Sequence, residues 1–84
     1  DVLTTTLTPR RRNADWTHWQ TARAPGAVAP GSWLRSFNPI LRASRVFAKS
    51  YIAAIEAGGW DGHNEFTIPT IARHLGFQVA DIAG

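Results

Sequence analysis

Hydrophobic residues recur at spacings of three and four between positions 45 and 57, which predicts an amphipathic helix over Arg45–Ala57. Arg45, Lys49 and Glu56 occupy its other face. Ser44 precedes the segment and is a suitable N-cap, and two glycines follow it as a C-terminal stop. The apolar stripe that we expect to face the core comprises Phe47, Ala48, Tyr51, Ile52, Ala54 and Ile55.

A second helix is predicted over residues 64–75, ending at Gly76. Pro69 lies inside this span, where a proline removes one backbone hydrogen bond. The proline therefore either kinks the helix or opens a new helix after a first turn at residues 63–68. The apolar stripe of this segment comprises Ile68, Ile71, Ala72 and Leu75.

Strands are predicted at both ends and in the middle of the chain. Val2, Leu3 and the threonines after them favour a strand over residues 1–7, which Pro9 stops. A short strand over residues 40–42 follows Asn38-Pro39, a dipeptide that marks a turn or an extended kink. The sequence "FQVADI" predicts a last strand over residues 77–82.

Residues 10–32 have no strong periodicity. We expect a polar loop over residues 10–13, then a short helix through Gln20 capped by Asn13 or Asp15, with Trp16 and Trp19 on one face. Residues 22–32 are rich in proline, glycine and alanine, which is typical of a functional lid or of a disordered loop. The whole order of elements indicates a piece of a mixed α/β domain.

Composition narrows the possible chemistry. The 84 residues suffice for one small domain at most, over residues 1–84, and the absence of cysteine excludes disulfides, zinc–thiolate sites and a thiol nucleophile. There is no methionine, and the chain opens within a predicted strand, so we interpret it as an internal fragment of a longer protein. No apolar run approaches the ~18 residues of a membrane span and no signal peptide is visible, which predicts a cytoplasmic protein.

The chain is basic, with a formal net charge of +3 and a pI near 10.7. This balance suits an anionic partner such as a phosphate group, although a fragment also carries the local charge of its parent surface. The run Arg10-Arg11-Arg12 is best interpreted as a solvated charge run. The other arginines that contribute most are Arg35, Arg42 and Arg45.

The stretch "GGWDGHNEFTIPT", residues 58–70, concentrates the candidate chemistry. Glu65 in a first helical turn either complements the helix dipole or, partly desolvated at the rim of the apolar stripe, acts as a general base. Trp60 is either a core anchor or a platform for a sugar ring. Asp61 and His63 could bind sugar hydroxyls or a metal. His63 is otherwise an exposed turn residue or a residue that caps the helix.

Three segments together resemble a group of bacterial glycosyltransferase-like proteins. "GGWDGHNEFTIPTIARHLGF" resembles the Trp–Gly–His–x–Glu segment near the end of their catalytic domain, and "SFNPILRASRVFAKSYIAAIEAGGW" resembles the segment before it. "DVLTTTLTPRRRNADWTHW" is similar to an earlier strand and aromatic loop. The resemblance covers most of the chain and implies the acceptor side of a GT-A-type nucleotide-sugar transferase, an α/β domain.

The resemblance also implies roles for single residues. Glu65 matches the base that deprotonates the acceptor hydroxyl, and Trp60, Asp61 and His63 match the turn that faces the acceptor. Arg42 and Ser44 match positions that face the donor phosphates or structure the site, and Arg45 adds a second cation. The metal-binding Asp-x-Asp motif and the first βαβ unit of the GT-A fold are missing from the sequence. The resemblance therefore implies that both lie upstream of Asp1, including any site for Mg²⁺ or Mn²⁺. The expected partners are a nucleotide-sugar donor and a carbohydrate or other hydroxyl acceptor.

Three other functions remain open from the sequence. "TIPTIARHLGF" and the basic charge suit a helix-turn-helix DNA-binding module, whose recognition helix would be the short "QVADIAG". A non-catalytic interaction module would use its four tryptophans as a core or a binding surface. A hydrolase would need Asp61 and Glu65 as a carboxylate pair. Nucleic acid is the less expected partner, because "QVADIAG" holds few side chains that read bases.

Overall fold

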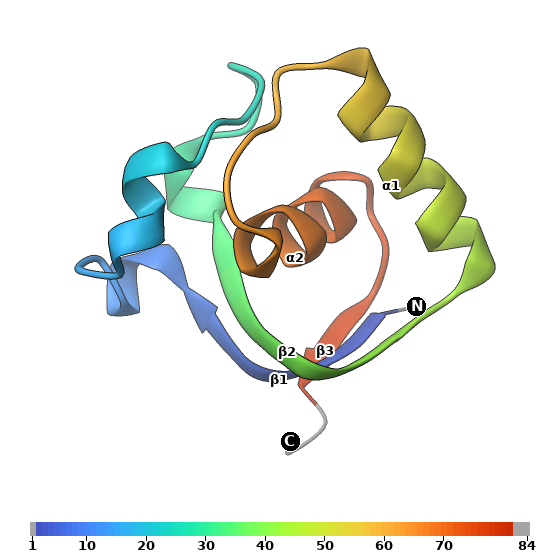
Figure 1. Ribbon diagram of the computed structural model, residues 1–84, viewed down its shortest axis with the longest axis horizontal. Helices are drawn as coiled ribbons and strands as arrows, with labels where there is room; N and C mark the ends of the chain where they lie inside the picture. The colour runs from blue at the N-terminus through green and yellow to red at the C-terminus, as the bar shows by residue number, and fades with distance from the viewer. Residues whose placement is uncertain (1, 82–84) are drawn as a thin grey trace.

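A computed structural model describes residues 2–81, which form a small mixed α/β domain (Figure 1). Its elements are the strands β1 (Val2–Pro9), β2 (Leu34–Ala43) and β3 (Val79–Asp81), the helices α1 (Arg45–Ala57) and α2 (Asn64–His74), and 3₁₀ turns at Arg10–Arg12, Thr17–Thr21 and Pro30–Ser32. The sheet has the order β2-β1-β3, with β1 antiparallel to β2 and parallel to β3. Helix α2 lies in the hollow of the curved sheet, between α1 on one flank and residues 10–33 on the other (Figure 1).

Strand β2 is longer than the predicted strand over residues 40–42, because it begins at Leu34 and includes residues 38 and 39. Between the pairs Leu3–Arg42 and Thr5–Phe37 the chain advances two residues on β1 but five on β2. A proline donates no ladder hydrogen bond, and β2 is an edge strand, where such an irregularity is tolerated. The expectation of a turn at Asn38-Pro39 was wrong, and the extended alternative is confirmed.

The predicted helix before Gln20 was also wrong in type and in its cap. The segment forms a five-residue 3₁₀ turn, Thr17–Thr21, whose N-cap position is Trp16, with no side-chain cap. Tryptophan, threonine and histidine are mediocre helix formers, and a 3₁₀ turn suits so short a segment. The expected contact of the two tryptophans is present, since the Trp16 and Trp19 rings meet edge to face at 4.8 Å.

Both helices occur where they were predicted. Helix α1 has the predicted bounds, and the Ser44 side chain accepts a hydrogen bond from the Phe47 backbone N–H at 3.1 Å. Helix α2 runs unbroken for eleven residues through Pro69, so the proline does not open a new helix. Gly76 follows its end with a φ of 84°, a value that glycine adopts without strain. Strand β3 lies inside the predicted span of residues 77–82, of which residue 82 is outside the described residues.

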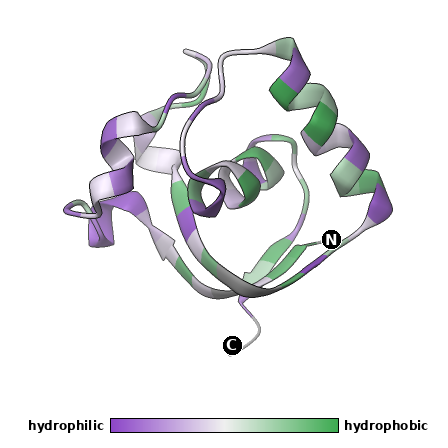
Figure 2. Cartoon of the chain, viewed as in Figure 1, coloured by the Kyte–Doolittle hydropathy of each residue, from purple (hydrophilic) through white to green (hydrophobic). Residues whose placement is uncertain are grey.

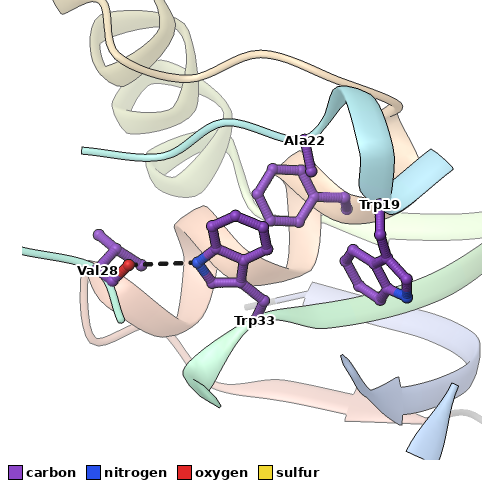
Figure 3. Packing of buried hydrophobic residues seen from close by; sticks show 5 residues of the cluster. Trp19, Ala22, Val28 and Trp33 are labelled. Carbon is purple, nitrogen blue, oxygen red and sulfur yellow. Dashed lines mark hydrogen bonds between the residues drawn. The ribbon is translucent and has the colours of Figure 1, made fainter. Parts of the chain in front are cut away.

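Two hydrophobic clusters flank α2. The first contains Trp19, Ala22, Val28, Trp33 and Phe66, and in Figure 3 the Trp33 indole donates to the Val28 carbonyl at 3.3 Å. The second contains Val2, Phe47, Ile71 and Ala72. Trp60 packs against both clusters, which makes it a structural link between the two sides of the domain.

The predicted stripes differ from the buried faces. On α2 the buried set is wider than expected and comprises Phe66, Thr67, Pro69, Thr70, Ile71 and Ala72, whereas Leu75 is exposed. The reason is that α2 is enclosed by the sheet and by both flanks. On α1 only Phe47 is fully buried, and Ile52 and Ile55 are 56% and 38% exposed. Helix α1 therefore contacts the body of the domain along a narrow seam.

We predict that Ser44→Ala lowers the free energy of unfolding by about 1 kcal/mol, because the first turn of α1 loses its capping acceptor. In a domain of this size such a change lowers Tm by roughly 4–8 °C, which calorimetry measures. Ser44→Asp keeps an acceptor at the same place and should retain the stability. Equal losses in both variants would contradict the capping role.

We predict a larger loss, about 2 kcal/mol or more, for Thr70→Val. The buried Thr70 hydroxyl donates to the Leu34 carbonyl at 3.1 Å and accepts from the Leu34 N–H at 2.9 Å. Pro9, opposite Leu34 in the sheet, has no N–H with which to replace the hydroxyl. Urea unfolding should show Thr70→Ser close to wild type, and a valine variant of equal stability would show that the hydroxyl contributes nothing.

Candidate functional site

The N-terminus of α2 carries two of the side chains that the sequence singled out. His63 is the N-cap, and its Nδ1 accepts a hydrogen bond from the Glu65 backbone N–H at 3.1 Å. In this geometry Nδ1 holds no proton, so the imidazole offers Nε2 as its donor when neutral. The Glu65 side chain is 16% exposed, and its Oε1 lies 3.8 Å from Nε of Arg35. The partly desolvated carboxylate expected at this rim is thus present.

Arg35, at the start of β2, is fixed from three directions. Besides the Glu65 carboxylate, its Nη1 donates to Oδ1 of Asn13 at 2.6 Å. Its guanidinium also lies over the Trp16 ring, 4.4 Å from the ring centre, a distance typical of a cation–π contact. Arg35 is therefore fixed beside the Glu65 carboxylate, with which it forms an ion pair at a distance longer than a hydrogen bond.

Two imidazoles meet beside this ion pair. The rings of His18 and His63 lie 4.4 Å apart, and Trp16 contacts both, at 5.1 Å and 5.7 Å. We call the whole set the Glu65 cluster, and its members are Asn13, Trp16, His18, Arg35, His63 and Glu65. The cluster places a carboxylate and two imidazoles, which are groups that accept and donate protons, beside the permanent cation of Arg35 and the Trp16 ring.

Sequence reasoning found only part of this cluster. It assigned no role in the site to Asn13, Trp16, His18 or Arg35. Asn13 and Trp16 lie between the first two 3₁₀ turns, His18 lies in the second turn and Arg35 in β2, all far from Glu65 along the chain. No local spacing marks such a set. The one available signal was the high local density of histidine and tryptophan in "DWTHW".

Trp60 and Asp61 lie on a different side of α2. Both line a groove of about 350 Å³ between α1 and the start of α2, whose lining includes neither His63 nor Glu65. Asp61 is exposed and its Oδ1 accepts from the Gly62 N–H at 2.8 Å, while its backbone pairs with that of Arg23. The structure therefore divides the predicted acceptor-facing turn between two surfaces.

Arg42 and Ser44 are not brought to Glu65. Arg35 lies at one end of β2 and Arg42 at the other, where Arg42 is exposed. Arg42 and Ser44 line a separate shallow pocket of about 390 Å³ beside Leu3. The Ser44 hydroxyl already accepts a hydrogen bond as the cap of α1.

The arginine run is solvated only in part. Arg11 and Arg12 are exposed, as expected. The guanidinium of Arg10 instead lies over the rings of Trp33 and Trp19, at 5.3 Å and 5.9 Å from their centres. Its aromatic neighbours thus hold it against the first hydrophobic cluster.

Within residues 2–81, no group of three or more His, Asp or Glu side chains is placed to hold a metal ion. None of the helices in the same residues has the length and hydropathy to cross a membrane.

Comparisons of the chain with protein-family models, with curated proteins and with solved structures found no match. The relationship to glycosyltransferases consequently stays a prediction that rests on the motifs in the sequence. The roles of the site residues rest on those motifs and on the geometry above.

We predict that Gly62→Ala disrupts the turn that carries both surfaces. Gly62 has a φ of 115°, and an added Cβ would lie 2.9 Å from Cα of Ala22. The strain and the clash together should lower the unfolding free energy by about 2 kcal/mol or more. Gly26→Ala is the matched control, because its Cβ meets nothing within 4 Å. Similar thermal unfolding of both variants would contradict this close packing.

Proposed function

We propose that the chain is the acceptor-side part of a glycosyltransferase, which transfers a sugar from a nucleotide-sugar donor to an acceptor hydroxyl with Glu65 as the general base. The observation that carries the proposal is the partly buried Glu65 carboxylate at the start of α2, held by Arg35 beside a pair of imidazoles. The GT-A-type architecture is part of the same proposal, with the nucleotide-binding unit outside this chain.

In the proposed reaction Glu65 accepts the proton of the acceptor hydroxyl. The oxygen then forms a bond to the anomeric carbon of the donor sugar, while the bond from that carbon to the diphosphate oxygen breaks and the nucleoside diphosphate leaves. Arg35 is a positioning residue, since its contacts with Asn13 and Trp16 fix the guanidinium that holds the carboxylate. Nε2 of His63 provides a hydrogen-bonding group near the base.

The geometry supports the other predicted roles unequally. Trp60 and Asp61 remain candidate acceptor contacts through the groove that they line. Arg42 and Ser44 gain no support as donor contacts, because Arg42 lies at the opposite end of β2 from Arg35 and Ser44 follows that end.

The structure offers less to the alternative functions. A helix-turn-helix module would need a recognition helix after Gly76, but residues 79–81 form strand β3 beside β1. A binding surface made of tryptophans is also not favoured, because Trp19 and Trp33 are buried in the first hydrophobic cluster.

We predict that Glu65→Gln lowers the transfer rate by about a hundredfold or more while the fold is retained, because glutamine keeps the size but accepts no proton. The assay measures nucleoside diphosphate release from a panel of nucleotide-sugars with added acceptors. It uses the full-length protein, with any segments that flank this chain present.

Lys49→Gln is the matched control for this assay, as it neutralises an exposed charge on α1 that lines neither pocket. Equal rates for wild type and Glu65→Gln would show that Glu65 is not the base and that it only complements the dipole of α2. Turnover of no donor by the wild type would overturn the proposal, and salt-dependent DNA binding would then be measured.

A further inference from the structure

The groove beside α1 is built from two walls of different character. Tyr51, Ile52 and Ile55 of α1 form an apolar wall, and Trp60 lies opposite in the loop that leads to α2. Tyr51 and Thr67, which both line the groove, are joined by a hydrogen bond of 2.8 Å between their hydroxyls. Figure 2 shows α1 mixing hydrophobic and hydrophilic positions along its length, as expected of a helix attached by a narrow seam.

The charge of the groove is opposite to that of the chain. The sequence carries a net charge of +3, yet the ionisable acidic and basic groups lining the groove are Glu56 and Asp61, both carboxylates. Among its described lining residues there is no arginine, lysine or histidine. A negatively charged ligand would therefore be repelled here, whereas a neutral or cationic one would not.

Polar groups line the groove beside the aromatic ring. Asp61 keeps a carboxylate oxygen beyond the one that accepts from Gly62, and the exposed amide of Asn64 offers both a donor and an acceptor. A sugar presents an apolar ring face together with equatorial hydroxyls that bind such groups. The combination of Trp60 with a carboxylate and an amide suits that chemistry better than a purely apolar ligand.

We infer that this groove binds a sugar ring that carries no negative charge, as a unit of the acceptor remote from the reacting hydroxyl. The link to the reaction rests on the proposed function. Asn64 faces the groove while Glu65 faces Arg35, because adjacent helical positions point about 100° apart. An acceptor of more than one sugar would pass around the first turn of α2 to reach both sides.

Amide and indole NMR spectra of the chain, titrated separately with maltose, N,N′-diacetylchitobiose and glucuronic acid, test this inference. A neutral saccharide should shift the Trp60 indole and the Asn64 backbone signals, with a Kd on the order of millimolar, as is usual for a shallow site. Glucuronic acid should bind at least tenfold more weakly than the better of the two neutral sugars.

Two variants probe the walls of the groove. Asn64→Ala removes an exposed hydrogen-bonding group, and Ile52→Lys places a long charged chain in the apolar wall. Each should weaken neutral-sugar binding about fivefold or more. Val46→Lys is the matched control, because Val46 is an exposed apolar residue of the same helix outside the groove lining, and it should bind as wild type.

Three results would overturn the inference: no shift in the groove with either neutral sugar, equal or tighter binding of glucuronic acid, or an equal loss in Val46→Lys and Ile52→Lys. The Glu65→Gln variant separates this inference from the proposed function, since it should bind the neutral sugar normally. If the groove binds the neutral sugar but the full-length protein transfers no sugar, only the proposed transferase activity is refuted. If the full-length protein transfers a sugar but the groove binds none, only the inferred sugar binding in the groove is refuted.

Discussion

The packing of Phe66 is the constraint on which the rest of the domain depends. Its ring is fully buried and contacts those of Trp33, Trp19 and Trp60, with ring centres 4.8, 5.8 and 6.2 Å apart. These three tryptophans come from three separate segments, so one side chain fixes the first turn of α2 against all of them. In so small a core, the burial of these aromatic rings supplies a large share of the hydrophobic stabilisation of the fold.

Because Phe66 fixes the helix, its neighbours in sequence are fixed too. Glu65, before Phe66, is directed toward Arg35, and Thr67, after it, bonds to Tyr51 in the lining of the groove. One buried residue thus sets the direction of two functional surfaces. A substitution that loosens the packing around Phe66 should therefore change the positions of both Glu65 and the residues that line the sugar groove.

Asn13 couples the hydrophobic core to the Glu65 cluster. Its backbone carbonyl accepts from the Trp19 indole at 2.6 Å, and its side-chain oxygen accepts from Arg35 at the same distance. Asn13 in the loop after β1 therefore links the buried Trp19 to the Arg35–Glu65 ion pair. These two contacts hold both the backbone and the side chain of Asn13 in place, although Asn13 lies outside the helices and strands.

The sequence alone determined the elements whose signals are local. The spacing of apolar residues, the Ser44 cap and the glycines that follow predicted α1 to the residue, and Glu65 was correctly placed in the first turn of α2. Local signals also left alternatives open, since Asn38-Pro39 allowed a turn or an extended kink, and only the pairing of β2 with β1 on either side of it selected the extended form. The buried face of α2 was underestimated because its width depends on what surrounds the helix.

Only the tertiary structure decided which side chains meet. Arg35 and Glu65 are thirty positions apart, and no periodicity relates them, so their ion pair follows from the packing of α2 against β2. The same packing separated Trp60 and Asp61 from Glu65, and left Arg42 at the other end of the strand. Hydrophobic spacing and capping act within a few residues of one another, whereas the composition of a site depends on contacts that only chain folding brings together.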